Sequence, residues 1–531
     1  MKTCLQSLTP AAFQKKHIWF ARVIFLIGVI RIAEYTIDRY YGNGDGYMTT
    51  SLPAFGLTLL YTAGFLLTLI LSVRTCKLEH KSPWIHVGIV VALSLGLWMI
   101  FYPASMSPDS VEQYTQAYTQ EFRDWHPPIM ALVLSGVMIC GGDIEALMLF
   151  QCLLGSLGIY YCAKQIIGIS KIPPRAASCL ALMLFCILLY PLSPLATYLM
   201  IFWKDTWCAV LMLWVLSISL KLYYRAHVFS KLKFYGSYFA FILIAAITLL
   251  TRHNAIVMLP FLVLISSLIL FYQRRFSWSS AIVFSLSLFI MYIGLYRGQY
   301  FFFQVEQQHA GQQVIALDLV GMIVYKPQLQ HEFPYISQHV TDKYAEVYEY
   351  GDIVPLYTSV LKTSSFDRDE MLREYRHAIL KYPLTWLYVK LRAFYELIRP
   401  SRIHYWFLMG ISENPYGLSQ NTLLQSLRES LRIRLLIVWN SPILRVFSGI
   451  HLVWIGVTIW TIGSLGKRFY TCRQPAMLLW LSVFSMLFAY YASYLFATTA
   501  WDFRLMYPAT LSGQVIILAY LLKVLYEKYN L

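Results

Sequence analysis

Long apolar runs alternate with short polar turns along most of this sequence. The hydrocarbon core of a bilayer is about 30 Å thick, so a helix needs about 20 apolar residues to cross it. Runs of that length predict an all-α polytopic membrane protein with about 12 transmembrane helices. The predicted spans are residues 19–35, 52–73, 84–101, 144–162, 176–201, 207–222, 235–250, 255–272, 279–296, 443–465, 476–496 and 505–525.

The pattern divides the chain into four segments. Residues 1–83 form a predicted N-terminal transmembrane hairpin, and 84–296 form a transmembrane core whose first outward loop is 103–128. Residues 297–434 are the one extended polar region, an insertion, and 435–531 return to transmembrane helices. Within the insertion, apolar residues recur on one helical face, which predicts an amphipathic helix with a break at Pro383.

The apolar stretch 129–140 is only about a dozen residues long, which favours an interfacial or re-entrant helix over a span. With the N-terminus inside, the Lys and Arg clusters between later spans then fall on one side, as the positive-inside bias requires. Counting this stretch as a span would invert everything after it. We therefore expect both termini to be cytoplasmic and the insertion to be periplasmic, with juxtamembrane helices on the outward face.

Composition agrees with this pattern. Hydrophobic residues make up 58% of the chain and charged residues 13%, too apolar a mixture for one soluble domain of this size. The net charge of +16 comes from short clusters, which indicates membrane topology and not nucleic-acid binding. The cysteines follow no metal-ligand spacing. We expect six of them to be buried without disulfides: Cys140, Cys152, Cys162, Cys179, Cys186 and Cys208.

Polar residues gather at the predicted outer ends of the spans. Asp109 follows the third span, Asp124 and His126 precede two prolines, and Lys204 and Asp205 form an oppositely charged pair. Each has a structural alternative, as a helix cap, part of an interfacial anchor or a local salt bridge. A carboxylate at a membrane surface can instead serve as a general base toward a hydroxyl, and a lysine can bind a phosphate.

Two further outer turns offer groups of the same kind, Arg252 in one and Asp502 with Arg504 in the other. A lipid phosphate needs cations at its head and an apolar groove for its tail. A helical bundle with such charged turns at the outer ends of its spans supplies both. The joint placement on one face therefore predicts a single outward-facing site.

With these residues, the chain resembles the GT-C superfamily, membrane glycosyltransferases that use a polyprenyl-phosphate-linked donor. It is most similar to the bacterial branch of family 39-like and lipopolysaccharide-core enzymes. The resemblance covers the third span to the C-terminus and rests on Asp109, the run 124–128, the Lys204-Asp205 pair and the run 502–508. Two features depart from the family: Ser110 follows Asp109 where many relatives have a second acid, and the soluble part is inserted before the last three spans.

The resemblance implies inverting transfer of a hexose or pentose from a polyprenyl-phosphate donor to a cell-envelope glycan or lipid, at the periplasmic face of a bacterial inner membrane. Asp109 is the implied catalytic base. The implied donor-phosphate ligands are Arg504, Arg252 and Lys204, and the implied substrate-positioning residues are Asp124, His126, Asp205 and Asp502. Membrane lipids are expected partners. No protein-bound metal is assigned, and a divalent metal as cofactor stays open.

Two alternatives stay open. A polysaccharide polymerase or O-antigen ligase would have similar spans and a large outward loop, but would rely on Arg and His in that loop and not on Asp109. A transporter would carry ionisable residues inside spans, near the membrane midplane. Only Arg22, Arg31 and Glu34, in the first predicted span, favour transport.

Overall fold

The computed structural model describes residues 84–169, 172–189, 194–272, 277–362, 366–399, 410–429, 431 and 450–529. All of them belong to one compact unit, Leu57–Leu531. The predicted hairpin 1–83 lies outside the described residues, and so do Arg22, Arg31 and Glu34 of its first predicted span. Within the described ranges the chain is all-α, and its few β-bridges are isolated.

Eight helical stretches of the described chain are long and apolar enough to cross a membrane, which supports a multi-pass membrane protein. Each covers a predicted span. They are α3 (Trp84–Phe101), α6 (Ile144–Ile167), α9 (Lys204–Arg225), α10 (Lys231–Leu250), η3 (His253–Met258) with α11 (Leu259–Tyr272), α12 (Trp278–Phe303), α22 (Pro475–Ala497), and η7 (Phe503–Met506) with α23 (Tyr507–Tyr529).

Two predicted spans differ in the structure. Residues 176–201 do not form one span, because α7 (Pro174–Ile187) ends early and a short helix, α8 (Leu195–Tyr198), follows Pro194. Proline lacks the N–H that a continuous helix needs and disfavours helix at the residue before it. Part of 443–465 lies outside the described residues, and α21 (His451–Cys472) covers the rest but is not among the eight.

Two helices follow the third span outside the set of eight. These are α4 (Pro108–Thr119) and α5 (Ile129–Ile139). With 11 residues, α5 is about 16 Å long at about 1.5 Å per residue, so it is too short to cross the bilayer, as predicted. Gly141 after it has a φ of 83°, a left-handed conformation that glycine adopts without penalty, and the chain then turns into α6.

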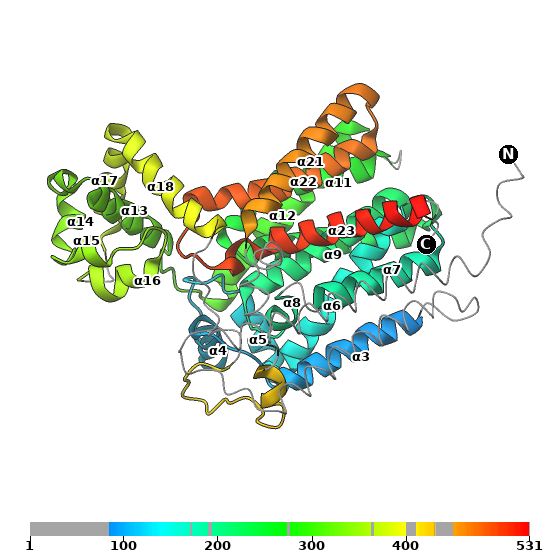
Figure 1. The fold of residues 1–531 in the computed structure, drawn as a ribbon, viewed down its shortest axis with the longest axis horizontal. Coiled ribbons are helices and arrows are strands. Elements are labelled where there is room, and N and C mark those ends of the chain that lie inside the picture. The colour runs from blue at the N-terminus through cyan, green and yellow to red at the C-terminus, as the bar shows by residue number, and fades with distance from the viewer. Residues whose placement is uncertain are drawn as a thin grey trace, which may run out of the picture. The chain divides into compact units, whose positions relative to one another are not determined.

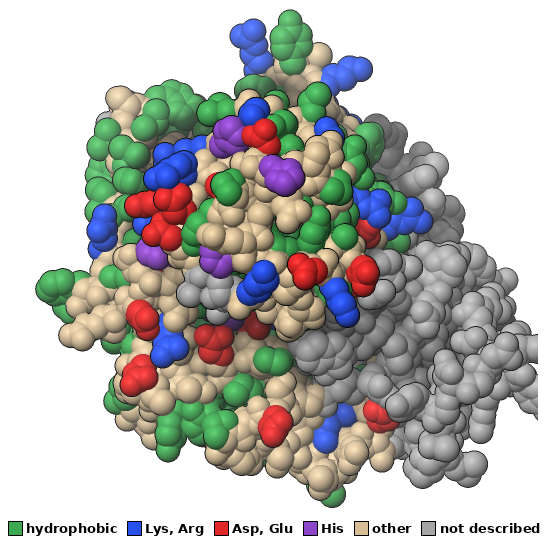
Figure 2. Space-filling view, turned by 90° about the vertical axis from the view of Figure 1, so that its left-hand side faces the viewer, with side chains coloured by type: hydrophobic (Ala, Val, Ile, Leu, Met, Phe, Trp, Pro, Cys, Tyr) green, Lys and Arg blue, Asp and Glu red, His purple; other side chains and the backbone are tan. Residues whose placement is uncertain are grey.

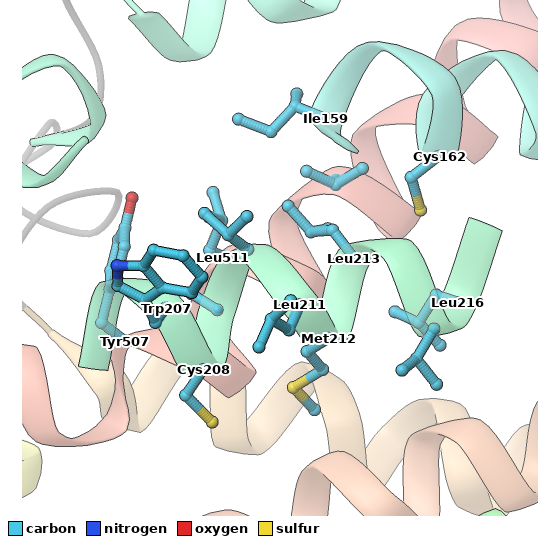
Figure 3. Packing of buried hydrophobic residues seen from close by; sticks show 14 of the residues in the cluster. Ile159, Cys162, Trp207, Cys208, Leu211, Met212, Leu213, Leu216, Tyr507 and Leu511 are labelled. Carbon is cyan, nitrogen blue, oxygen red and sulfur yellow. The ribbon is translucent and has the colours of Figure 1, made fainter. Parts of the chain in front are cut away.

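The core of the span bundle is built around α9, in which 83% of the residues of an 18-residue apolar window are buried. It packs against α6, α10 and α23. Figure 1 shows α9 beside α6 and α23, and Figure 3 shows Trp207, Leu211 and Leu213 of α9 among residues of α6 and α23. Glycine allows the close approach to α6, since a Cβ at Gly155 would meet Val210 at 2.9 Å and one at Gly158 would meet the Trp214 ring at 3.1 Å.

The insertion folds around a hydrophobic core of its own. Its helices are α13 (Gly311–Tyr325), α14 (Pro334–Gln338), α15 (Tyr344–Val347), α16 (Ile353–Pro355), α17 (Arg368–Lys381) and α18 (Pro383–Ile398). The break predicted at Pro383 is confirmed, because α17 ends and α18 begins there. The preceding span α12 extends to Phe303, beyond its predicted end.

The side chain of Lys390 forms a buried ion pair inside this insertion and also joins the insertion to the span α22. Lys390 Nζ lies 2.6 Å from Asp318 Oδ2, and both side chains are almost fully buried. Tyr375 Oη donates to the same carboxylate over 2.7 Å, and Lys390 Nζ also donates to the backbone carbonyl of Phe496 over 2.9 Å. Because Phe496 is in the last turn of α22, one ammonium group connects the insertion with the end of a span.

The cysteine prediction is only partly correct. Cys152, Cys162, Cys186 and Cys208 are free and buried, as expected. Cys140 is free but exposed, because it lies at the C-terminal end of the short helix α5 and outside the span bundle. Cys179 is disulfide-bonded, contrary to the prediction.

Replacement of Lys390 by alanine should strongly destabilise the protein. The change leaves the Asp318 carboxylate buried without its cation, which typically costs about 3 to 5 kcal/mol. Thermal unfolding of the detergent-purified protein measures this as a lower midpoint. Lys381→Ala is the matched control, since Lys381 pairs with Glu332 at the surface and should change the midpoint little. Equal midpoints for both variants would contradict the assigned role of the pair.

Candidate functional site

The loop after α3 is fixed against the segment before α9. Ser105 N–H donates to the Met200 carbonyl over 2.8 Å, and Phe202 N–H donates to the Ser105 carbonyl over 3.2 Å. Ser107 then caps α4 in a reciprocal capping box with Ser110, and proline occupies the first helical position. These local rules place Asp109 in the first turn of α4, beside the N-terminus of α9.

Arg504 is the centre of the site. Its NH2 lies 2.9 Å from Asp109 Oδ2 and its Nε lies 2.8 Å from Asp502 Oδ2. The guanidinium also lies over the Trp203 ring, 4.7 Å from the centroid, a cation–π contact. Asp502 additionally accepts a hydrogen bond from the Arg504 backbone, capping η7. One arginine therefore joins two carboxylates from opposite ends of the sequence.

His126 and Lys204 lie on the other side of Asp109. Lys204 Nζ is 2.5 Å from His126 Nδ1. His126 Nε2 is 3.9 Å from Asp109 Oδ1 and 3.7 Å from Glu112 Oε2, beyond hydrogen-bond distance from either carboxylate. This buried nitrogen makes no hydrogen bond with the described residues. An oxygen atom placed among Nε2 and the two carboxylates would satisfy it.

The electrostatics of these groups follow from their neighbours. Burial raises the pKa of Asp109, but the positive charges of Arg504 and Lys204 outweigh burial and hold that pKa well below its usual range. Burial, together with the positive charge of Lys204, holds the pKa of His126 well below its usual value. At neutral pH Asp109 is therefore ionised and His126 is neutral. With Nδ1 accepting from the Lys204 ammonium, the His126 proton is on Nε2 and faces the carboxylates.

Glu112 is a site residue that sequence reasoning did not select. It lies one helical turn after Asp109 in α4, on the same side. Burial and the neighbouring charge of Asp109 raise its pKa. The i, i+3 spacing from Asp109 was a signal available in the sequence. Glu112 is thus the more basic carboxylate of the two that face His126.

Arg252 and Asp205 form a second, buried ion pair beside this network. The Arg252 guanidinium lies over the Tyr494 ring, 5.5 Å from the centroid, and its Nε donates to Asn254. Asp205 follows Lys204 in the first turn of α9, so the second pair adjoins the first cluster. Arg252 is therefore already neutralised by a carboxylate.

Asp124 is not part of either cluster of ion pairs. Its carboxylate accepts hydrogen bonds from Tyr300 Oη over 3.1 Å and from the Gln308 backbone over 2.6 Å. The Asp124 N–H donates to the Glu306 carbonyl. This residue ties the loop before α5 to the chain after α12, and so supports His126 two residues later.

An open cavity of about 490 Å³ lies between this loop and the end of α12, with aromatic and polar walls. It is lined by Gln120, Glu121, Phe122, Arg123, Phe302, Phe303, Gln304 and Glu306. The Arg123 side chain forms an ion pair with Glu306 at 3.3 Å, and its charge also acts on Glu112. Figure 2 shows an end of the molecule where acidic, basic and histidine side chains are intermixed.

The described residues do not fit a divalent metal. Among them, no group of three or more His, Cys, Asp or Glu side chains is arranged as metal ligands. Asp109, Glu112 and His126 converge, but Arg504 occupies one carboxylate and Lys204 lies against the histidine. The positive charges of Arg504 and Lys204 inside the cluster repel a metal cation, so we assign no role to a metal.

Comparison with family models, curated proteins and solved structures finds no match for this chain.

Asp109→Asn should make stability less sensitive to acid. Because the pKa of Asp109 is lower in the folded protein than in the unfolded chain, its ionised form stabilises the fold at neutral pH. That contribution is lost progressively over the window that begins near about pH 5 and extends down to the lowered pKa of the folded protein. Thermal midpoints across this window should fall more steeply in the wild type than in Asp109→Asn. Parallel slopes for the two proteins would refute the assignment. Asp342→Asn, at an exposed site in the insertion, is the control and should follow the wild type.

Proposed function

We propose that the chain is a GT-C-type inverting glycosyltransferase that moves a sugar from a polyprenyl-phosphate donor to a cell-envelope glycan or lipid. The single observation that supports this most is the shared position of Arg504 between Asp109 and Asp502, beside the unsatisfied Nε2 of His126. A phosphate ligand, a carboxylate base and a hydroxyl-orienting donor are thereby adjacent.

The donor phosphate binds Arg504, with Lys204 as a second cation. The phosphate competes with Asp109 for the Arg504 guanidinium. Donor binding therefore weakens the ion pair that makes Asp109 a poor base in the absence of donor. An apolar surface for the polyprenyl tail is supplied by α12, in which only 17% of the residues of an 18-residue apolar window are buried and residues such as Val283 and Ile290 are exposed. The outer end of α12 adjoins the loop that leads to His126.

The acceptor hydroxyl occupies the space that His126 Nε2 faces. It accepts a hydrogen bond from Nε2 and gives its proton to Asp109 as its oxygen attacks the anomeric carbon. The bond between that carbon and the phosphate oxygen breaks, and the polyprenyl phosphate departs with its charge stabilised by Arg504 and Lys204. Glu112 is the second carboxylate within reach of the same proton. The open cavity beside Arg123 holds the remainder of the acceptor.

We place the site at the periplasmic face of a bacterial inner membrane. The basic residues Lys164 and Arg225 lie in the last turns of α6 and α9, at the ends of these spans remote from Asp109. Arg225 donates to the Gly168 carbonyl, so these ends lie together. Clustered Lys and Arg favour the cytoplasmic side. Both termini are then cytoplasmic.

The alternatives are less well supported by the same observations. A polymerase or ligase would centre on Arg and His in the outward region, whereas the ion-pair network here includes Asp109 of α4. A transporter would have charged groups near the middle of spans. The Asp205–Arg252 pair instead joins the first turn of α9 to the residue before η3, at span ends.

Asp109→Asn should abolish sugar transfer while leaving the folded structure and donor binding in place, with a lower thermal midpoint at neutral pH because the ionised carboxylate contributes to stability. Asparagine keeps the size of the side chain but removes its basicity, and general-base contributions are typically about 100-fold to 10,000-fold. The measurement is transfer by purified protein from a panel of polyprenyl-phosphate-linked hexoses and pentoses. Asp342→Asn is the matched control. Transfer by Asp109→Asn at nearly the wild-type rate would reject Asp109 as the base.

Glu112→Gln separates the two carboxylates. If Asp109 is the base, Glu112→Gln should retain most of the transfer rate, because Glu112 only adds negative charge near the proton. Loss of activity in Glu112→Gln with retention in Asp109→Asn would assign the base role to Glu112.

Arg504→Ala should weaken donor binding as well as sugar transfer, since it removes a cation from the proposed phosphate position.

The proposed topology is tested by labelling engineered cysteines in intact cells. A reagent that cannot cross the membrane should reach a cysteine at Gln330, in the insertion, but not one at Arg468, near the end of α21. The positive-inside bias is the physical reason. Labelling of both positions from the same side would overturn this topology.

A further inference from the structure

Helix α18 exposes a continuous apolar stripe. Leu384, Leu387, Tyr388, Leu391 and Tyr395 are all exposed, and Leu384 is 80% exposed. Their spacing of three and four residues puts them on one face of the helix. The opposite face is buried in the insertion and against α22, through residues that include Val389, Lys390, Ala393 and Leu397. A helix of a water-soluble domain would normally present charged residues on its outer face.

The position of α18 relates this stripe to the membrane. Lys390 donates to the Phe496 carbonyl and the Trp386 ring stacks on the Phe496 ring, with 6.3 Å between centroids. Phe496 lies in the last turn of a candidate span and is itself 58% exposed. The exposed surface of a span is its lipid-facing surface, because apolar side chains there have no other solvent. These contacts place α18 at the end of the span α22, where the bilayer surface begins, with the stripe on the face of the helix turned away from α22.

The residues that border the stripe suit an interface between hydrocarbon and water. Tyr388 and Tyr395 combine an apolar ring with a polar tip, and tyrosine is enriched at the level of lipid headgroups. Arg399, at the end of the helix, donates to Tyr395 Oη over 3.2 Å and is exposed. Arginine at such a position reaches the headgroups while its stem covers apolar surface.

We propose that α18 is an interfacial helix whose stripe lies in the outer leaflet of the membrane that the spans cross, so that lipid covers this face of the insertion. Interfacial helices of this kind place an apolar face among the upper acyl chains and keep polar groups among the headgroups. The occupant of the stripe is thus a lipid surface and not a second copy of the chain. This inference does not depend on the proposed enzyme activity.

The test places one fluorescent amino acid in the full chain by stop-codon suppression and reconstitutes the protein in lipid nanodiscs. A label at position 384 should be quenched by brominated acyl chains at least about twofold more strongly than by aqueous iodide, because the stripe is in lipid. A label at position 338 is the matched control. Gln338 is exposed at the end of α14, which packs on α13 and α17 and not on α22. A label at position 338 should be quenched more strongly by iodide than by brominated acyl chains.

Each result decides the question. Quenching at position 384 by iodide and not by brominated lipid would place the stripe in water and overturn the proposal. Protection of position 384 from both quenchers would show that a second copy or another protein covers it, and would overturn the proposal equally. A paired change, Leu384→Glu with Leu391→Glu, gives a second readout: it should lower lipid quenching of a label at position 387, and unchanged quenching would count against the inference.

Discussion

Hydrocarbon solvates charge poorly, and this constraint organises the described part of the chain. Ionised groups are expensive at the centre of a bilayer, so they collect where spans end and water or protein can meet them. Here Lys204, Asp205, Arg252 and Arg504 all lie at the first residues of spans or directly before them. The cost of burying charge in hydrocarbon keeps these groups out of the middle of the spans. It also brings them together, because the span ends of one bundle lie at one surface.

The arginines gathered at this surface are each neutralised by carboxylates. Arg504 is satisfied by two carboxylates and an indole face, and Arg252 by one carboxylate and a phenol ring. His126 Nε2, by contrast, is buried and makes no hydrogen bond with the described residues. A site in which each arginine is already paired with a carboxylate responds to an arriving anion by exchange, since the anion takes a place that a carboxylate held. In the proposed reaction, donor binding would also release the Asp109 carboxylate to act as the base.

Sequence reasoning predicted much of this fold and part of the site. Hydropathy located eight spans because burial in lipid needs only length and apolarity, and Pro383 located a break because proline acts locally. The extended segment before Lys204 was not predicted, since it depends on hydrogen bonds with Ser105, about a hundred residues earlier in the chain. Trp203 was missed for the same reason, because its contact with Arg504 joins residues distant in sequence. Glu112 was missed although its i, i+3 spacing from Asp109 was visible in the sequence.

The ammonium of Lys390 is shared between a carboxylate of the insertion and a carbonyl at the end of a span. Separation of the two parts would leave the Phe496 carbonyl and one N–H of the buried Lys390 ammonium without their hydrogen bond, which is disfavoured, while the Lys390–Asp318 pair would stay intact inside the insertion. The insertion is therefore anchored to the end of α22, and only the short segment 498–502 lies between that anchor and the Asp502–Arg504 pair.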